Sequence, residues 1–457
     1  MEQQKNESRL GTMPVGRLML GMSLPMMLSF FIQALYNIVD SIFVAQISEN
    51  ALTAVTLAFP MQQAVHAISV GIGVGVSASV PRALGQKDAR KAARYAGTAV
   101  VIDFLAMLLF AVLGMTAAHA VYAAQTDVSE IVDMGTTYLS ICWIVCAGDF
   151  YGQIFEKLLI STGRSTMAMA AQAAGAVFNI VFDPLLIFGV GPFPKMGVAG
   201  AAIATVLGQV LGAVIALILN IRFNASLHVV RSDLRLRIAE VKDIFAVGIP
   251  SMITIGLGSA TTFFINQILL SYSTTAAAVY GIWMKLQNFS FMPIFGMNNG
   301  IVPILSYNHA CGKLDRVKRT IRLSVTAIAV YTGILFLVLE LIPGAILYLF
   351  NASDNMFSIG MTALRTCILS LPLGGTCIIL TTTMQALRHS RYTLIVNILR
   401  QFVYIVSCFA LLSFLTHSLK VVWIAVPAAE ALSLVTAAVF ERRMWRDLFG
   451  HPEQQTA

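Results

Sequence analysis

Charged residues are scarce in this chain. Only 11% of its 457 residues are Asp, Glu, Lys or Arg, whereas 57% are hydrophobic, and the mean hydropathy is +0.78. A soluble domain carries roughly 25% charged residues, so a soluble fold of this composition would lack the polar surface needed to cover its exterior. Lipid is the solvent that this composition fits.

Signatures of catalysis and of nucleotide binding are also missing. The six cysteines form no CxxC pair and mostly lie in apolar runs, where Cys behaves as a small hydrophobe, so neither a disulfide nor a zinc site is expected. The sequence has no HExxH spacing, no Walker A motif and no nucleophile–base pattern. We therefore expect no enzyme, no catalytic residue, no cofactor and no nucleic-acid partner.

Long apolar segments recur from Leu18 to Phe440. In hydrocarbon the backbone must satisfy its own hydrogen bonds, which leaves helices or a closed barrel. Barrel strands are about 9–11 residues long and alternate in polarity, whereas these segments are longer and uniformly apolar. We expect an all-α integral membrane fold with twelve transmembrane helices, at 18–43, 53–80, 96–121, 135–158, 166–189, 198–221, 244–270, 277–306, 323–349, 359–387, 392–416 and 421–440.

The basic residues distinguish the two sides of the membrane. With these helices, all but five of the 30 Lys and Arg residues, Lys5 among them, lie on one side. The exceptions are Lys195 and Lys420 on the other side and Lys285, Arg365 and Arg400 within helices. The positive-inside rule places the basic side, with both termini, in the cytoplasm.

The two halves of the chain echo each other about 225 residues apart. Gly21–Pro25 returns as Val247–Pro250, and the basic loop Pro81–Asp88 returns near Cys311–Asp315. Six helices per half is an even number, so both six-helix bundles should enter the membrane in the same direction and be related by a pseudo-two-fold axis along the membrane normal. The expected parts are an N-terminal lobe (1–221), a cytoplasmic linker (222–243), a C-terminal lobe (244–440) and a cytoplasmic tail (441–457).

Acidic residues inside these helices are the strongest functional signal, because a charge at the bilayer centre costs about 2.5–3.5 kcal/mol on insertion scales. Gln33, Asn37 and Asp40 share one face of the first helix, and Asn179 and Asp183 are spaced i and i+4 in the fifth. Carboxylate and amide oxygens together suit a small cation or a proton relay. The alternative is a buried polar cluster that only ties helices together.

Other buried polar residues have weaker interpretations. We expect Glu156 to lie at the cytoplasmic interface beside Lys157, and His66 to have a hydrogen-bonded packing role. Glu340 has no evident polar partner nearby in the sequence, and Glu430 follows Pro427. None of these acids is assigned to the site.

The sequence, with its motifs in this order, resembles members of the MATE family, the multidrug and toxic compound extrusion transporters. It is most similar to the MepA-like bacterial branch of that family. The motifs that carry the resemblance are Pro25 with Asn37 and Asp40, the loop Arg82–Asp88, Asn179–Pro184 and Gly197–Thr205. The resemblance covers nearly the whole chain. It implies a bacterial plasma membrane protein that exports organic, mostly cationic and amphipathic compounds, antibiotics among them, in exchange for H⁺ or Na⁺.

The resemblance also implies the residues of the site. The cation-coupling residues would be Asp40, Tyr138, Asn179, Asp183 and Thr205, with Na⁺ possible at Asp40, Asn179 and Asp183. The substrate cavity would include Gln33, Asn37, Asn266 and Lys285. Some relatives carry an acid in the seventh helix, where this chain has Asn266, so coupling through the C-terminal half is not expected.

A related flippase for lipid-linked saccharides would share this helix layout, and it remains the alternative function. Such a protein should have a basic central cavity to hold phosphate, whereas this chain has more acidic than basic residues within its helices. The expected partners are small organic cations and the lipid bilayer, and we expect a monomer.

The charge distribution predicts that Asp127 lies outside the cell and Arg235 inside. Single cysteines at these positions can be tested on whole cells with a membrane-impermeant thiol reagent. The cysteine at 127 should react and the one at 235 should be protected. The opposite pattern would overturn the orientation.

Overall fold

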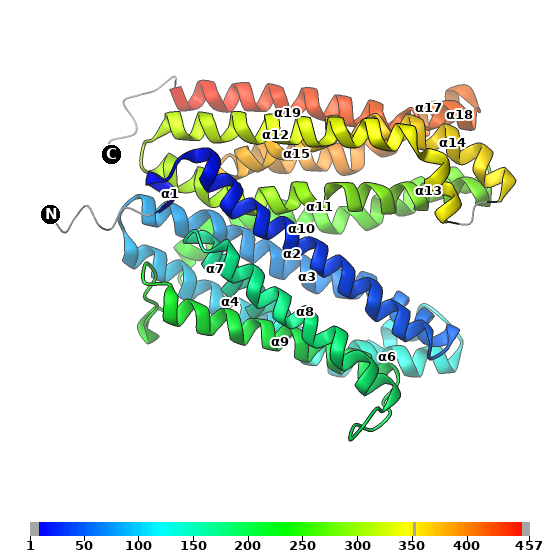
Figure 1. The fold of residues 1–457 in the computed structure, drawn as a ribbon, viewed down its shortest axis with the longest axis horizontal. Coiled ribbons are helices and arrows are strands. Elements are labelled where there is room, and N and C mark those ends of the chain that lie inside the picture. The colour runs from blue at the N-terminus through cyan, green and yellow to red at the C-terminus, as the bar shows by residue number, and fades with distance from the viewer. Residues whose placement is uncertain (1–8, 351–352, 450–457) are drawn as a thin grey trace. The chain divides into compact units, whose positions relative to one another are not determined.

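The computed structural model describes residues 9–350 and 353–449, and these are almost entirely helical, with no strand among them (Figure 1). Lys5 and residues 450–457 of the predicted tail lie outside the described residues. The helices up to residue 223 are α1 (Arg9–Thr12), α2 (Val15–Ala45), α3 (Glu49–Gly85), α4 (Ala89–Thr116), α5 (Ala118–Ala123), α6 (Ser129–Ile144), α7 (Ala147–Ser161), α8 (Ser165–Phe188) and α9 (Val198–Phe223).

The rest of the chain begins with a short 3-10 turn, η2 (Arg231–Asp233), and later contains a π-helical turn, η3 (Leu399–Tyr404). Its α-helices are α10 (Ile238–Leu270), α11 (Thr274–Ala310), α12 (Leu314–Leu341), α13 (Pro343–Leu349), α14 (Asp354–Ile368), α15 (Ser370–Ala386), α16 (Ser390–Ile398), α17 (Ile405–Thr416), α18 (Leu419–Val422) and α19 (Ala425–Phe449).

Ten helical segments of the described chain are long and apolar enough to cross a membrane, and the bent pair α6–α7 makes an eleventh. The remaining predicted segment, 277–306, coincides with α11, which is 37 residues long. Helix α11 carries Lys285 and, further along, the adjacent pair Asn298 and Asn299, and these polar residues keep it from counting among the apolar spans. Each of the twelve predicted segments therefore coincides with a helix or with a bent or interrupted one.

Two predicted helix limits were wrong because hydropathy alone does not detect helix signals. The third helix was predicted at 96–121 but is α4 from Ala89, because the Asp88 carboxylate caps it by accepting a hydrogen bond from Lys91 N at 2.8 Å. The segment predicted at 323–349 is α12 from Leu314 to Leu341, and Pro343 then starts α13. Basic residues in a first turn lower the hydropathy without ending the helix.

The predicted fourth helix, 135–158, is also not continuous. It consists of α6 and α7, bent by 41°. The bend directs α7 onto α9, where a Cβ placed on Gly148 would lie 2.6 Å from Gln209 Cβ. At the other end of the chain, α19 continues to Phe449, so the predicted tail begins inside a helix.

The described residues form two compact units, whose limits cross α10 and α11. Unit 1 contains the residues up to Met252 together with Asn299–Leu314, and unit 2 contains Ile253–Asn298 and the residues from Asp315. Each unit is a set of residues that pack mainly with one another. The lobe limits predicted from the sequence, 1–221 and 244–440, stay a prediction.

Unit 1 is built around α7, α8 and α9. Helix α8 packs against both α9 and α2, and α7 packs against α9 and α3, an arrangement that Figure 1 shows for the green helices. The segment before α10 is tied to α4, since Thr98 Oγ1 donates to Arg235 O at 3.1 Å. In unit 2 the closest partners are α15 and α19.

Glycines make the crossing of α8 and α9 possible. A Cβ added to Gly208 would lie 2.8 Å from Gly175 O, which is too close for any real carbon atom, whereas a Cβ on Gly333 of α12 would meet nothing within 4 Å. We predict that Gly208→Ala lowers the free energy of unfolding by about 1–3 kcal/mol through overpacking.

Gly333→Ala is the matched control, because the same added methyl group should instead be neutral or stabilising by about 0.5–1 kcal/mol in a helix. Melting temperatures of the purified proteins in detergent compare the two variants. Equal melting temperatures would contradict a backbone-to-backbone contact at Gly208.

Candidate functional site

A cavity of about 370 Å³ lies within unit 1. Helices α2, α3, α6, α7 and α9 supply its walls, and among the described residues no Lys or Arg lines it. The predicted residues Gln33, Asn37, Asp40, Tyr138 and Thr205 all line this cavity. The polar face predicted for the first helix is therefore turned toward one shared space.

The centre of the site is a pair of carboxyl groups from neighbouring helices. Asp40 of α2 and Asp183 of α8 interact electrostatically where these two helices pack together. Asn179 Nδ2, one turn before Asp183, donates to Asp183 Oδ1 at 3.2 Å and to Thr205 Oγ1 of α9 at 3.3 Å. Asp183 is fully buried and Asn179 nearly so. Four of the five predicted coupling residues thus meet where α2, α8 and α9 come together.

Three oxygen atoms at this meeting point have no hydrogen-bond donor in the described chain: Asp40 Oδ1, Asn179 Oδ1 and Asp183 Oδ2. A buried polar atom normally has a partner, because leaving it unpaired costs about 1–3 kcal/mol and more for a charged group. Two carboxylates that face each other also repel unless a positive charge lies between them. The group lacks positive charge, and a proton or a small hard cation would supply it.

Tyr138, the fifth predicted residue, belongs to an adjacent cluster. Its buried hydroxyl accepts a hydrogen bond from Gln62 Nε2 at 3.4 Å, and Gln62 also approaches Cys142 Sγ at 3.5 Å. Gln62 was not among the predicted residues. Tyr138 shares the cavity with Asp40, but no hydrogen bond joins it to Asn179, Asp183 or Thr205 among the described residues.

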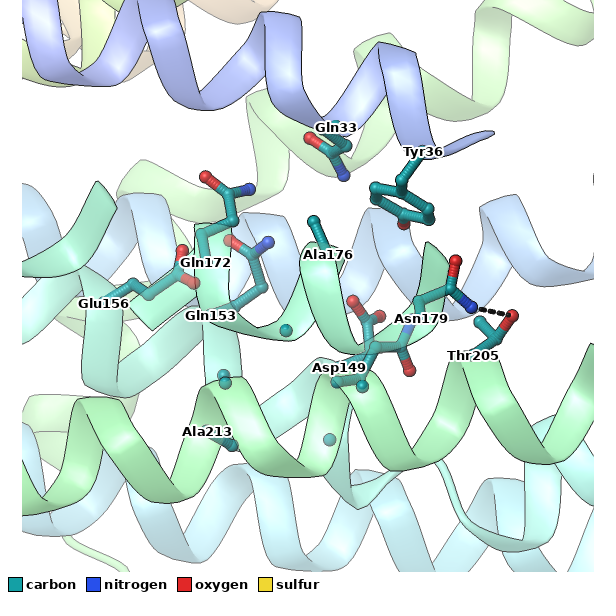
Figure 2. Close-up of a pocket in the computed structure, with 16 residues that line it drawn as sticks. Gln33, Tyr36, Asp149, Gln153, Glu156, Gln172, Ala176, Asn179, Thr205 and Ala213 are labelled. Carbon is teal, nitrogen blue, oxygen red and sulfur yellow. Dashed lines mark hydrogen bonds between the residues drawn. The ribbon is translucent and has the colours of Figure 1, made fainter. Parts of the chain in front are cut away.

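A second, narrower cavity of about 80 Å³ continues from the first. Gln33, Tyr36, Asp149, Thr205 and Gln209 line both. Figure 2 shows this narrow cavity with Asn179 and Thr205 at one end and Gln153, Gln172 and Glu156 toward the other.

Two of the expectations from the sequence concern residues beside these cavities. Glu156 was expected at the cytoplasmic interface beside Lys157, and its side chain lines the narrow cavity (Figure 2), on the same face of α7 as Asp149 and Gln153. His66 of α3 is hydrogen-bonded as expected, with Nδ1 3.3 Å from Asp149 Oδ1. It also lines the larger cavity, so it is not only a packing residue.

The remaining predicted cavity residues lie in unit 2. Asn266 is half-buried on α10, and the exposed Lys285 of α11 has its Nζ 5.5 Å from the ring centroid of Phe350. Neither residue lines the two cavities of unit 1. Their assignment to the substrate site stays a prediction.

Two acids of unit 2, Glu340 and Glu430, have basic partners that the sequence did not indicate. Glu430 accepts two hydrogen bonds of 2.8 Å from Arg400, one from Nε and one from Nη2. Glu340 lies 3.5 Å from Arg365 Nε. Both partners are far from these acids in the sequence, which is why Glu340 seemed isolated.

Comparison with known proteins accounts for this architecture. The MatE family model matches residues 25–185 and again residues 250–410. A FAD transporter of Shewanella oneidensis is 24% identical over 448 residues, which are 96% of this chain and 97% of that protein. The multidrug export protein MepA of Staphylococcus aureus is 26% identical over 428 residues, 93% of each chain.

The fold has a close counterpart among solved structures. A multidrug resistance MATE family transporter of the MOP superfamily, solved in an outward-facing conformation, aligns over 97% of this chain and 98% of its own with a TM-score of 0.90 and 22% identity. The all-α membrane fold with twelve helices in two bundles is thereby confirmed. The two matches to the family model also repeat the internal spacing seen in the sequence. The chain is a multi-pass membrane protein of the MATE family of multidrug efflux transporters.

Proposed function

We propose that this transporter exports organic cationic, amphipathic compounds in exchange for H⁺ or Na⁺, which binds at Asp40 and Asp183. The observation that carries the proposal is the pair of facing carboxyl groups with three oxygens that lack a donor. Such a group attracts one positive charge at a time. A proton or metal cation and an organic cation would therefore compete for it, which is the basis of antiport.

The larger cavity supports an organic substrate. Its volume of about 370 Å³ falls in the range of 300–1,000 Å³ typical of sites for drug-sized ligands. Tyr36, Phe59 and Trp143 supply aromatic surface, while Asp40 and Asp149 supply negative charge. Aromatic faces and carboxylates together favour apolar cations.

An anionic substrate is the alternative to a cation. A flippase for lipid-linked saccharides would carry one, and one relative is a FAD transporter. A phosphate group is usually held by Arg or Lys. No such residue lines the cavities described in unit 1, and the buried Arg400 of unit 2 is already neutralised by Glu430. The charge of these sites favours a cation over a phosphate-bearing substrate.

The membrane potential would add driving force to such an exchange. Moving one elementary charge across 100 mV is worth about 2.3 kcal/mol. This corresponds to a roughly forty-fold concentration gradient of substrate for each net charge that enters, because 1.4 kcal/mol is a factor of ten.

A first test measures cation binding without transport. Na⁺ or acidification should raise the melting temperature of the purified protein, because a bound cation or proton removes the repulsion between Asp40 and Asp183; a ligand at one hundred times its Kd stabilises by about 2.7 kcal/mol. Asp183→Asn should abolish this response while folding normally. Glu340→Gln, which breaks only the partly exposed pair with Arg365, should retain it.

A second test measures coupled transport. In proteoliposomes with an imposed H⁺ or Na⁺ gradient, the protein should move a fluorescent cationic dye against the dye's own gradient. Asp183→Asn and Asp40→Asn keep the size of the side chain but fix it as neutral, so both should lose gradient-driven transport. Glu340→Gln should keep it. Uphill transport by Asp183→Asn at the parent rate would show that the coupling site lies elsewhere.

A further inference from the structure

The narrow cavity of unit 1 follows one face of each of three helices. Asp149, Gln153 and Glu156 are spaced i, i+4 and i+7 along α7, so one polar stripe spans about 10 Å at 1.5 Å per residue. Gln172 and Asn179 of α8 lie at i and i+7 and line the same space. Figure 2 shows these side chains converging between Glu156 and the Asn179–Thr205 hydrogen bond.

The size of this cavity restricts what it can hold. A site for a drug-sized molecule needs about 300–1,000 Å³, whereas this one has about 80 Å³. One water molecule needs about 10–15 Å³ of such space, so there is room for roughly five water molecules. The cavity suits a proton with its water chain or a small cation, and it is too small for the organic substrate.

The charges of the cavity are also suited to a positive ion. Asp149 and Glu156 face it, and the amides of Gln153, Gln172 and Gln209 can each donate or accept a hydrogen bond. Among the described residues, His66 of α3 is the one titratable side chain that forms a hydrogen bond with Asp149. Lys157 lies next to Glu156 but points away, toward Asn299 Oδ1, to which its Nζ donates.

The two ends of the cavity give it a direction. At one end, Asn179 and Thr205 belong to the carboxyl-pair site. At the other end, Glu156 lies five residues before the last residue of α7, Ser161, or about 7–8 Å along the helix. The loop that follows contains Arg164 and belongs to the side predicted to be cytoplasmic.

We propose that this narrow cavity is the route by which the coupling cation passes between the Asp40–Asp183 site and the cytoplasmic side, with Asp149 and Glu156 as its intermediate carriers. The proposal rests on the cation-coupled antiport proposed above. It assigns separate paths to the two transported species, since the larger cavity accommodates the organic compound and the narrow one admits only the ion.

Gly152 offers a means of closing the route. It lies in α7 beside Gln153, and a Cβ at this position would meet only Ala213 Cβ, at 3.9 Å, so a larger side chain would enter the cavity rather than a neighbouring helix. Gly148 and Gly175 are unsuitable, because a Cβ on either would lie 2.6 Å from protein atoms of α9. Gly152→Leu is therefore an uncharged plug.

The test compares binding with transport in the full-length protein. Gly152→Leu should keep the cation-dependent rise in melting temperature, because the carboxyl pair is intact. Its initial rate of gradient-driven dye export in proteoliposomes should fall at least tenfold. Gly333→Leu is the matched control. A Cβ there would meet nothing within 4 Å, and the residue lies on α12 in unit 2, away from the cavity lining, so its export rate should equal that of the parent.

Glu156→Gln provides a second measurement should Gly152→Leu fail to fold, since it keeps the size of the side chain and removes only the charge. It should keep a cation-dependent rise in melting temperature, which comes from the intact Asp40–Asp183 pair, and export dye at least tenfold more slowly. If Gly152→Leu folds and exports dye at the parent rate, the proposed route is wrong. If Gly152→Leu does not fold, export at the parent rate by Glu156→Gln would overturn the route instead. If the parent itself couples to neither gradient, the antiport proposal fails instead, so the two failures are distinguishable.

Discussion

Two carboxyl groups that meet inside an apolar helix bundle impose the main constraint on this protein. Asp40 and Asp183 come from helices α2 and α8, which pack together, and only Asn179 donates a hydrogen bond to Asp183 among the described residues. Taking a charge out of water is expensive unless it is paired. Helix packing enforces the proximity of the two acids, and the bundle is left with a deficit of positive charge that an ion from solution can fill.

The space around the pair depends on residues without large side chains. Gly175 and Gly208 let the backbones of α8 and α9 approach until a methyl group no longer fits between them. Both also line the narrow cavity, together with Gly152 and Ala213. Small residues in these three helices therefore bring helices into contact without any hydrophobic driving force in lipid, and they leave a polar passage that larger side chains would close.

The sequence was sufficient for the helices, their order and the clustering of Asp40, Asn179, Asp183 and Thr205, and insufficient for many of the other residues that line the cavities. Asn179 and Asp183 were found because they are spaced i and i+4 on one apolar helix, so the pattern is local. Gln62 was missed because its partners Tyr138 and Cys142 lie on another helix, and no local pattern reports such contacts. Glu156 was placed at the interface although its spacing from Asp149 and Gln153, i+7 and i+3 on α7, already put the three on one face. The bend between α6 and α7 was missed as well, because no proline in the apolar run marks it, and α7 then packs closely on α9.

The two halves repeat a fold but not its electrostatics. Helices α16–α17 and α19 occupy the places in the second half that α8 and α9 occupy in the first. There, the acid Glu430 is held by both hydrogen bonds of the Arg400 guanidinium. A guanidinium is a cation that cannot leave, so Glu430 has a permanent counter-charge. Among the described residues the Asp40–Asp183 pair of unit 1 has no such basic partner, and this difference is why we propose that a mobile cation acts there.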